Sequence, residues 1–396
     1  MSDKNNKTLK PGWRRVKFGD VVRLSKARSQ DPLADGIERY VGLEHLEPGD
    51  LRIRSWGSVA DGVTFTSVFQ PGQVLFGKRR AYQRKVAIAD FSGVCSGDIY
   101  VLETKDAQVL LPELLPFICQ TDTFFDHAVG TSAGSLSPRT NWTSLANYEF
   151  TLPPIEEQTR LLEALTAIEN TCDAYTDSLA KSRQILANIR DRVLWEGEGQ
   201  SLHDTSIGSI PVGWQAKQLG EVVEFLGGTQ PPASVFEFAP SPTNVRLIQI
   251  RDYKSDEFAT YIPLALAKKF CSADDVMIGR YGPPVFQILR GLEGAYNVAL
   301  IKAKPKDGLE KGYLYHYLKE QALLQLIEGL SRRSSGQSGV DMDKLKAYPI
   351  PLPPLETQQR LSRLFDSMES SLESIRSRLS ALIPLREQIL SATRTA

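Results

Sequence analysis

The side chains best suited to chemistry in this sequence are clustered cations. Residues 77–85, GKRRAYQRK, place five basic side chains around one tyrosine, directly after the strand-like apolar run QVLF. Arginine and lysine neutralise phosphates, arginine can bind guanine edges through two hydrogen bonds, and an aromatic ring can stack or brace the loop. The stretch therefore predicts a DNA-binding face, with a merely solvated hairpin as the alternative. Its residues are Lys78, Arg79, Arg80, Tyr82, Arg84 and Lys85.

A sparser version of this group occurs about two hundred residues later, in IGRYGPPVF at 278–286. Arg280 and Tyr281 precede Gly-Pro-Pro, and Arg290 follows further on. Fewer cations in the same setting predict a different base preference or a different loop path.

Two stretches rich in small polar residues form a second pair of candidates, GTSAGSLSPRTNW at 130–142 and SRRSSGQSGVDM at 331–342. Glycine and serine let backbone N–H groups approach phosphates, and the longer side chains suit base edges or backbone. A plain surface loop is the alternative. The candidate DNA-binding residues here are Arg139, Asn141, Arg332, Arg333 and Gln337.

The sequence gives little indication of nucleotide binding, methyl transfer, a metal site or a disulfide. GQVLFGKR at 72–79 resembles a phosphate-binding loop, but Arg79 stands where a magnesium-binding Ser or Thr is needed. GPPVF lacks the Asn or Asp head and the adjacent aromatic residue of an amino-methyltransferase tetrad. The histidines and cysteines are scattered without catalytic or ligand spacing, so no catalytic residue, metal site or disulfide is predicted. These residues are His45, His127, His203, His316, Cys95, Cys119, Cys172 and Cys271.

Length and composition favour a multidomain intracellular protein. The chain has 396 residues, enough for two or more domains, and its 47 basic and 47 acidic residues cancel. Any charged surface must therefore be local. Because neither a signal peptide nor a long apolar segment is evident, we expect a cytoplasmic protein without a membrane partner.

Nearly the whole chain consists of an internal sequence repeat. GWRRVKFGDVV at 12–22 matches GWQAKQLGEVV at 213–223, VLFGK at 74–78 matches VMIGR at 276–280, and TLPPIEEQ at 151–158 matches PLPPLETQ at 351–358. Small shifts in spacing are typical of loop insertions in a duplicated unit. Each copy begins with short apolar runs separated by Gly and Pro, which predicts an α+β domain, and ends in one long helix.

The two predicted helices carry apolar stripes with alternating steps of three and four. Each helix alone could lie on the core of its own domain, but two such stripes favour a coiled coil. The predicted segments are 1–152 and 200–352 for the domains, and 153–199 and 353–396 for the helices. The stripes comprise Leu165, Ile168, Cys172, Tyr175, Leu179, Leu186, Ile189 and Val193, interrupted by Ser182, and Phe365, Met368, Leu372, Ile375, Leu379, Leu382 and Ile389, interrupted by Arg386.

With LPPIEEQ and LPPLETQ at the helix starts and the GW openings at Trp13 and Trp214, the chain resembles the specificity subunits of Type I restriction–modification systems. The resemblance covers essentially the whole chain. It implies two target-recognition domains, separated by two helices that form an antiparallel coiled coil with pseudo-twofold symmetry. Each domain would bind one half of a split double-stranded DNA site.

The resemblance also implies partners that carry the catalysis. Two methyltransferase subunits would dock on the helices, and the full complex would add restriction subunits. N6-adenine methylation and ATP-dependent cleavage, with S-adenosylmethionine, ATP and Mg, would belong to those partners, and this chain would bind no cofactor. The alternative is a scaffolding protein that does not bind DNA and whose coiled coil mediates assembly.

Overall fold

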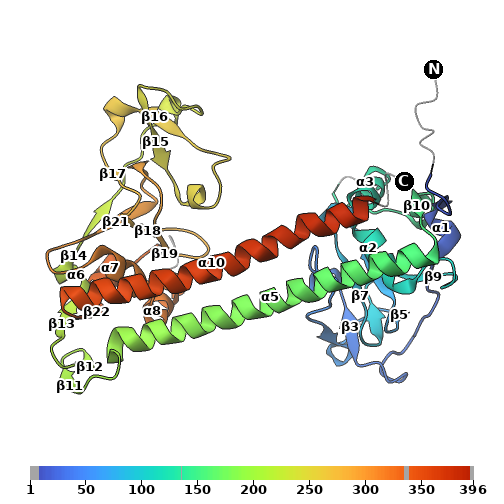
Figure 1. Cartoon of the computed structure of the whole chain (residues 1–396), viewed down its shortest axis with the longest axis horizontal. Helices are drawn as coiled ribbons and strands as arrows, with labels where there is room; N and C mark the ends of the chain where they lie inside the picture. The colour runs from blue at the N-terminus through green and yellow to red at the C-terminus, as the bar shows by residue number, and fades with distance from the viewer. Residues whose placement is uncertain (1–8, 135, 334–338, 393–396) are drawn as a thin grey trace. The chain divides into compact units, whose positions relative to one another are not determined.

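The computed structural model describes residues 9–134, 136–333 and 339–392. They divide into two compact units, one from residues up to Thr176 together with those from Ser377 on, and one from Asp177–Arg376. Each unit holds one α+β domain and part of each of two long helices, α5 (Ile155–Glu196) and α10 (Leu355–Ala392), drawn in green and red in Figure 1. None of the described helices combines the length and apolar composition that a membrane span requires.

In the described part of the first domain, two four-stranded sheets form the framework. One sheet is antiparallel with the order β2-β9-β6-β7, and the other has the order β4-β3-β8-β5, with β3 and β8 parallel. The elements are β1 Arg14–Lys17, α1 Phe18–Val21, β2 Val22–Leu24, β3 Arg39–Val41, β4 Gly57–Ser58, β5 Ser67–Phe69, β6 Val74–Gly77, β7 Val86–Ile88, β8 Gly93–Cys95, β9 Ile99–Thr104, α2 Leu115–Gln120, α3 Asp122–Gly130, α4 Trp142–Ala146 and β10 Glu149–Leu152.

The second domain repeats this framework. Its sheets have the orders β14-β21-β18-β19 and β16-β15-β20-β17, again with one parallel pair, β15 and β20. The elements are β11 Leu202–Thr205, β12 Gly208–Pro211, β13 Gln215–Gln218, α6 Leu219–Val222, β14 Val223–Gly227, β15 Asn244–Ile248, β16 Tyr261–Pro263, β17 Phe270–Cys271, β18 Val276–Gly279, β19 Gln287–Leu289, β20 Gly294–Tyr296, β21 Leu300–Pro305, α7 Lys311–Tyr317, α8 Gln321–Arg333, α9 Met342–Ala347 and β22 Pro349–Leu352.

The opening and closing strands of each domain pair with each other. Strand β1 is antiparallel to β10, with Arg14 opposite Leu152, and β13 is antiparallel to β22, with Gln215 opposite Leu352. Each long helix begins three residues after the closing strand. The repeated sheet orders confirm the predicted duplicated α+β fold, and both long helices lie inside the ranges predicted from the sequence.

The two helices pack against each other in opposite directions within each unit. In the first unit, the start of α5 meets the end of α10, where Leu165 and Leu390 share a buried cluster with the domain core. In the second unit, the end of α5 meets the start of α10, where Leu186 and Phe365 share a cluster. Both alternatives drawn from the sequence therefore apply, because each stripe contacts the other helix and a domain core.

Most stripe residues are removed from solvent. Leu165, Ile168, Leu179, Leu186 and Phe365 are buried, and Cys172, Tyr175, Val193, Met368, Leu372, Ile375, Leu379, Leu382 and Ile389 are half-buried. Arg386, the exception in the stripe of α10, pairs with Glu169 of α5 at 2.9 Å. This ion pair explains how a cation is accommodated between the helices.

The prediction for Ile189 was wrong, since its side chain is 39% exposed. Beyond Leu186 the buried face of α5 moves to Arg190 and Leu194. Arg190 donates a hydrogen bond to the carbonyl of Lys319 at 2.6 Å, so the last turns of α5 face the second domain rather than only α10. The helix ends at Glu196, and Gly197 follows with a φ of +67°, the left-handed conformation common after helix ends.

A buried glutamine fastens the start of each long helix to its domain. Gln158 accepts a hydrogen bond from the Leu111 N–H at 3.0 Å and donates to the carbonyls of Val109 and Pro153, both at 2.9 Å. Gln358 makes the same three contacts at 2.8–2.9 Å, with the Glu310 N–H and the carbonyls of Gly308 and Pro353. Both glutamines are fully buried. The last residue of each repeated LPP phrase is thus the one that joins helix to domain.

Replacing Gln158 by Leu should leave three buried or part-buried backbone groups without this partner and lower the free energy of unfolding by about 2–4 kcal/mol. Urea unfolding would measure this loss, and amide exchange at Leu111 would locate it. Thr159→Ala, on the exposed side of the same turn, is the control and should stay within about 0.5 kcal/mol of wild type. Equal effects of the two substitutions would contradict the role assigned to Gln158.

Candidate nucleic-acid interface

The structure brings the two predicted DNA-binding stretches of the first domain together. The chain from Lys78 follows β6, and residues 138–140 lie antiparallel to it, with Arg79 opposite Arg139. The Arg80 N–H donates to the Pro138 carbonyl at 2.7 Å, and the Thr140 N–H donates to the Lys78 carbonyl at 3.0 Å. The basic stretch and the Gly/Ser-rich stretch are therefore parts of one surface.

A carboxylate that the sequence analysis did not single out organises this surface. Asp98 lies 3.2 Å from an Nη1 of Arg79 and 2.8 Å from the Nε of Arg139. Burial opposes the charge on Asp98, but hydrogen bonds from Arg139 and Arg79 outweigh it and hold the pKa of this carboxyl below its usual value. Asp98 thus fixes two guanidinium groups side by side while half of the Arg139 side chain, 51%, stays exposed.

The other cations of the loop also have defined contacts within the domain. Arg80 and Arg84 adopt φ values of +54° and +56° on either side of a short helical turn at Ala81–Gln83. Tyr82, in that turn, is 56% exposed. The contacts are Lys78 over the Tyr100 ring at 4.6 Å, Arg84 over the Phe125 ring at 4.7 Å and beside Asp122 at 2.6 Å, and Lys85 donating to the Leu43 carbonyl at 2.7 Å.

Asn141 has a structural role that was not predicted. Its side-chain oxygen accepts a hydrogen bond from the Ser144 N–H at 2.8 Å and caps the start of α4. The polar stretch therefore ends at this cap, where α4 begins.

The second domain places fewer groups at the corresponding surface. Arg280 follows β18 and lies over the Tyr281 ring at 5.5 Å, ahead of Gly282 and a cis peptide bond between Pro283 and Pro284. A methyl group on Gly339 would lie 3.4 Å from the Tyr281 ring, so the polar stretch of this domain also approaches the loop.

Arg332 and Arg333 belong to the last turn of α8 and not to a loop, because the amphipathic helix that buries Leu323 and Ile327 extends to them. Gln337 lies outside the described residues.

Arg290 is engaged with a long helix. Its guanidinium lies 2.5 Å from Asp366 of α10 and 3.7 Å from the centre of the Tyr315 ring. The structure therefore places Arg290 where it joins the second domain to α10, and it does not bring this side chain to Arg280.

At the same place, three described residues are close enough together to be considered as metal ligands. His316, Asp366 and Glu369 bring their ligand atoms within 4.8 Å of one another. However, Arg290 pairs with Asp366, and Lys319 pairs with Glu369 at 2.8 Å. Two cations already neutralise the two carboxylates, and burial lowers the pKa of His316 to about 4. The group forms an ion-pair network between domain and helix.

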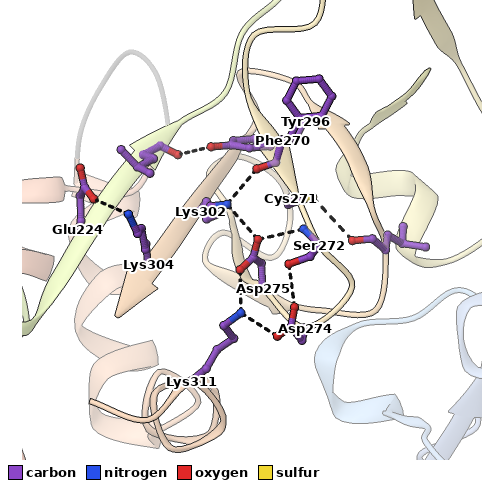
Figure 2. A network of polar contacts seen from close by, with 12 residues as sticks. Glu224, Phe270, Cys271, Ser272, Asp274, Asp275, Tyr296, Lys302, Lys304 and Lys311 are labelled. Carbon is purple, nitrogen blue, oxygen red and sulfur yellow. Dashed lines mark hydrogen bonds and ion pairs between the residues drawn. The ribbon is translucent and has the colours of Figure 1, made fainter. Parts of the chain in front are cut away.

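A second buried ion-pair network supports the strand that leads to Arg280 (Figure 2). Asp275, just before β18, lies 2.9 Å from Lys302 of β21 and 3.0 Å from Lys311 of α7, and it accepts a hydrogen bond from the Ser272 N–H. Burial opposes its charge, but the Ser272 N–H and the two lysines outweigh it and hold the pKa of Asp275 far below its usual value. The network joins three elements at the base of the loop.

Comparison with known proteins gives consistent matches in both halves. The family described as "Type I restriction modification DNA specificity domain" matches residues 12–181 and 211–383. The EcoDI specificity subunit of Escherichia coli is 30% identical over 179 residues, which cover 43% of this chain and 36% of that protein. The putative MjaX specificity subunit of Methanocaldococcus jannaschii is 24% identical over 200 residues, 46% of each chain. The chain thus aligns with less than half the length of these relatives.

Solved structures share the fold over the full chain. A chain from a study of complex assembly and conformational transition of the type I R-M system covers 98% of both chains, with a TM-score of 0.59 and 22% identity. The S subunit of a Type I restriction–modification system from M. genitalium covers 99% of this chain and 98% of its own, with a TM-score of 0.58 and 13% identity.

The Asp275 network predicts a pH-dependent contribution to stability. Because the pKa of Asp275 is lower in the folded than in the unfolded state, its contribution is fully present above the unfolded value of about 4 and is lost as pH falls below it. Asp275→Asn should therefore lower the thermal midpoint at pH 7, and the difference from wild type should shrink between about pH 4 and pH 2. A difference that stays constant over this range would contradict the assignment.

Proposed function

The chain belongs to the Type I restriction–modification DNA specificity family, and from this premise we propose that it selects the DNA target of a Type I complex. Each domain would bind one half of a split double-stranded site, and the paired helices would set the unread spacer between the halves. The observation that supports this most directly is the duplication, which repeats the sheets, the loop after the third strand of the antiparallel sheet and the glutamine contact at the helix start.

The surface of the first domain has the chemistry that DNA requires. Arg79 and Arg139 present neighbouring guanidinium groups held by Asp98, and the exposed Tyr82 lies in the same loop. Arginine groups held in place lose little side-chain entropy on binding and can contact guanine edges or phosphates. The Arg280 loop has fewer cations and a different backbone path, as two domains that bind different half-sites would have.

The proposal assigns catalysis to partner subunits. Two methyltransferase subunits would dock on the helices and carry N6-adenine methylation with S-adenosylmethionine. Restriction subunits would add ATP- and Mg-dependent cleavage to the full complex. This chain would contribute DNA recognition and assembly and would bind none of these cofactors itself.

Replacing Lys78, Arg79 and Arg80 by Ala should weaken DNA binding without preventing assembly with the methyltransferase. If the three cations neutralise phosphates, the slope of log affinity against log salt should become shallower by about one for each phosphate that the variant leaves unneutralised. Affinity measured between low and moderate salt would show this. Arg23→Ala, an exposed cation on β2 paired with Glu103, is the control and should leave the slope unchanged.

Unchanged affinity of the triple variant at low salt would remove this loop from the interface. Absence of any DNA binding by the wild-type chain together with its methyltransferase would instead favour a scaffolding protein.

A further inference from the structure

The first unit contains a cavity of about 620 Å³ at the junction of its domain with both long helices. Leu161 and Leu165 of α5 and Leu390 of α10 line the helix side. On the domain side, Tyr148 and Phe150 stack at 5.9 Å with their planes 11° apart. The cavity is thus partly apolar, with an aromatic wall.

The second unit has the same framework at this place, so residues can be compared directly. The Gln158 contact with residue 109 recurs as the Gln358 contact with residue 308, an offset of 199. At that offset, two cavity residues, Leu114 and Ile118, correspond to Tyr313 and Tyr317. The Tyr313 hydroxyl donates to the Pro351 carbonyl at 2.8 Å, and the Tyr317 hydroxyl donates to the Pro349 carbonyl. Larger side chains therefore occupy part of the corresponding space in the second unit.

The last turn of α5 packs beside these tyrosines. Leu194 is fully buried, and it lies with Trp195 in one apolar cluster with Tyr313 and Tyr317. The Trp195 indole N–H donates to Glu320 at 2.7 Å, which also accepts from the Tyr348 hydroxyl at 2.7 Å.

The two side chains of this hydrogen-bonded group, Glu320 and Tyr348, have counterparts in the first unit that line the cavity. Thr121 and Tyr148 correspond to Glu320 and Tyr348, and both line the cavity. The two long helices align at an offset of 200 residues. At this offset, Leu194 and Trp195 correspond to Arg394 and Thr395, which lie outside the described residues. The sequence therefore does not repeat the Leu-Trp pair that packs beside the tyrosines in the second unit.

We propose that this cavity receives an aromatic side chain, of the size of tryptophan, from the methyltransferase subunit. The inference rests on the proposed function, which places that partner on the helices. Leu161 and Leu165 of α5 and Leu390 of α10 line the cavity, so the cavity reaches both helices on which that partner would dock. Its partly apolar lining, with one aromatic wall, suits a buried anchor of a protein interface. DNA backbone is disfavoured, because the two fully charged side chains that line the cavity, Arg15 and Glu149, have opposite signs.

The second unit supplies the substitutions for a test. Leu114→Tyr with Ile118→Tyr reproduces Tyr313 and Tyr317. At an offset of 200, Thr151 and Glu149 correspond to Pro351 and Pro349, whose carbonyls accept the tyrosine hydroxyls. The full-length double variant should fold and bind the methyltransferase subunit at least about tenfold more weakly than wild type. Asp126→Ala, exposed on α3 and outside the cavity, is the control and should bind as wild type does.

Two further variants keep the result decisive. If the double variant does not fold, Thr123→Trp should fill the cavity from its exposed rim with the same loss of affinity. A chain ending at residue 392 should keep wild-type affinity, because the occupant comes from the partner.

Wild-type affinity in the filled variants would overturn the proposal. A loss of affinity on removing residues 393–396 that matches the loss on filling would also overturn it, in favour of an occupant from this chain. A wild-type chain that does not bind the methyltransferase subunit at all would reject the docking part of the proposed function, and the cavity proposal with it.

Discussion

The structure depends first on the way a single buried amide joins each long helix to its domain. Gln158 and Gln358 each satisfy one backbone N–H and two carbonyls at the junction of helix and domain. Because these contacts fix where each helix starts and which face it turns to the core, they also fix which residues point toward the other helix. In this register the apolar stripes of the two helices meet within each unit.

The same framework carries two different surfaces. In the first domain a carboxylate, Asp98, holds two arginines side by side. In the second domain a Gly-Pro-Pro sequence follows Arg280, and an ion-pair network around Asp275 supports the strand beneath it. Sheets and helix starts are shared because they determine folding, whereas loops can differ because folding constrains them less. This division is what a protein needs if its two halves bind different DNA sequences.

Periodicity predicted the long helices and the duplicated fold well, because stripes and repeats are visible in one dimension. It misplaced Ile189, since the buried face at the end of α5 follows the second domain rather than a constant heptad. It could not find Asp98 or Gln158, because partners of both side chains lie about 20 to 50 residues away in the chain. Arg290 carried the right chemistry for DNA, but its position beside Asp366 of α10 follows from tertiary packing alone.

Methylation patterns can show whether each proposed recognition domain binds its own half of the DNA site. Residues 1–150 would be exchanged for those of a family member with a different target, the hybrid expressed with its methyltransferase, and methylated adenines mapped across a genome by single-molecule sequencing. We expect one half of the methylated site to change while the other half and the spacer stay the same. A change in both halves, or in neither, would contradict the claim that each domain recognises its own half-site.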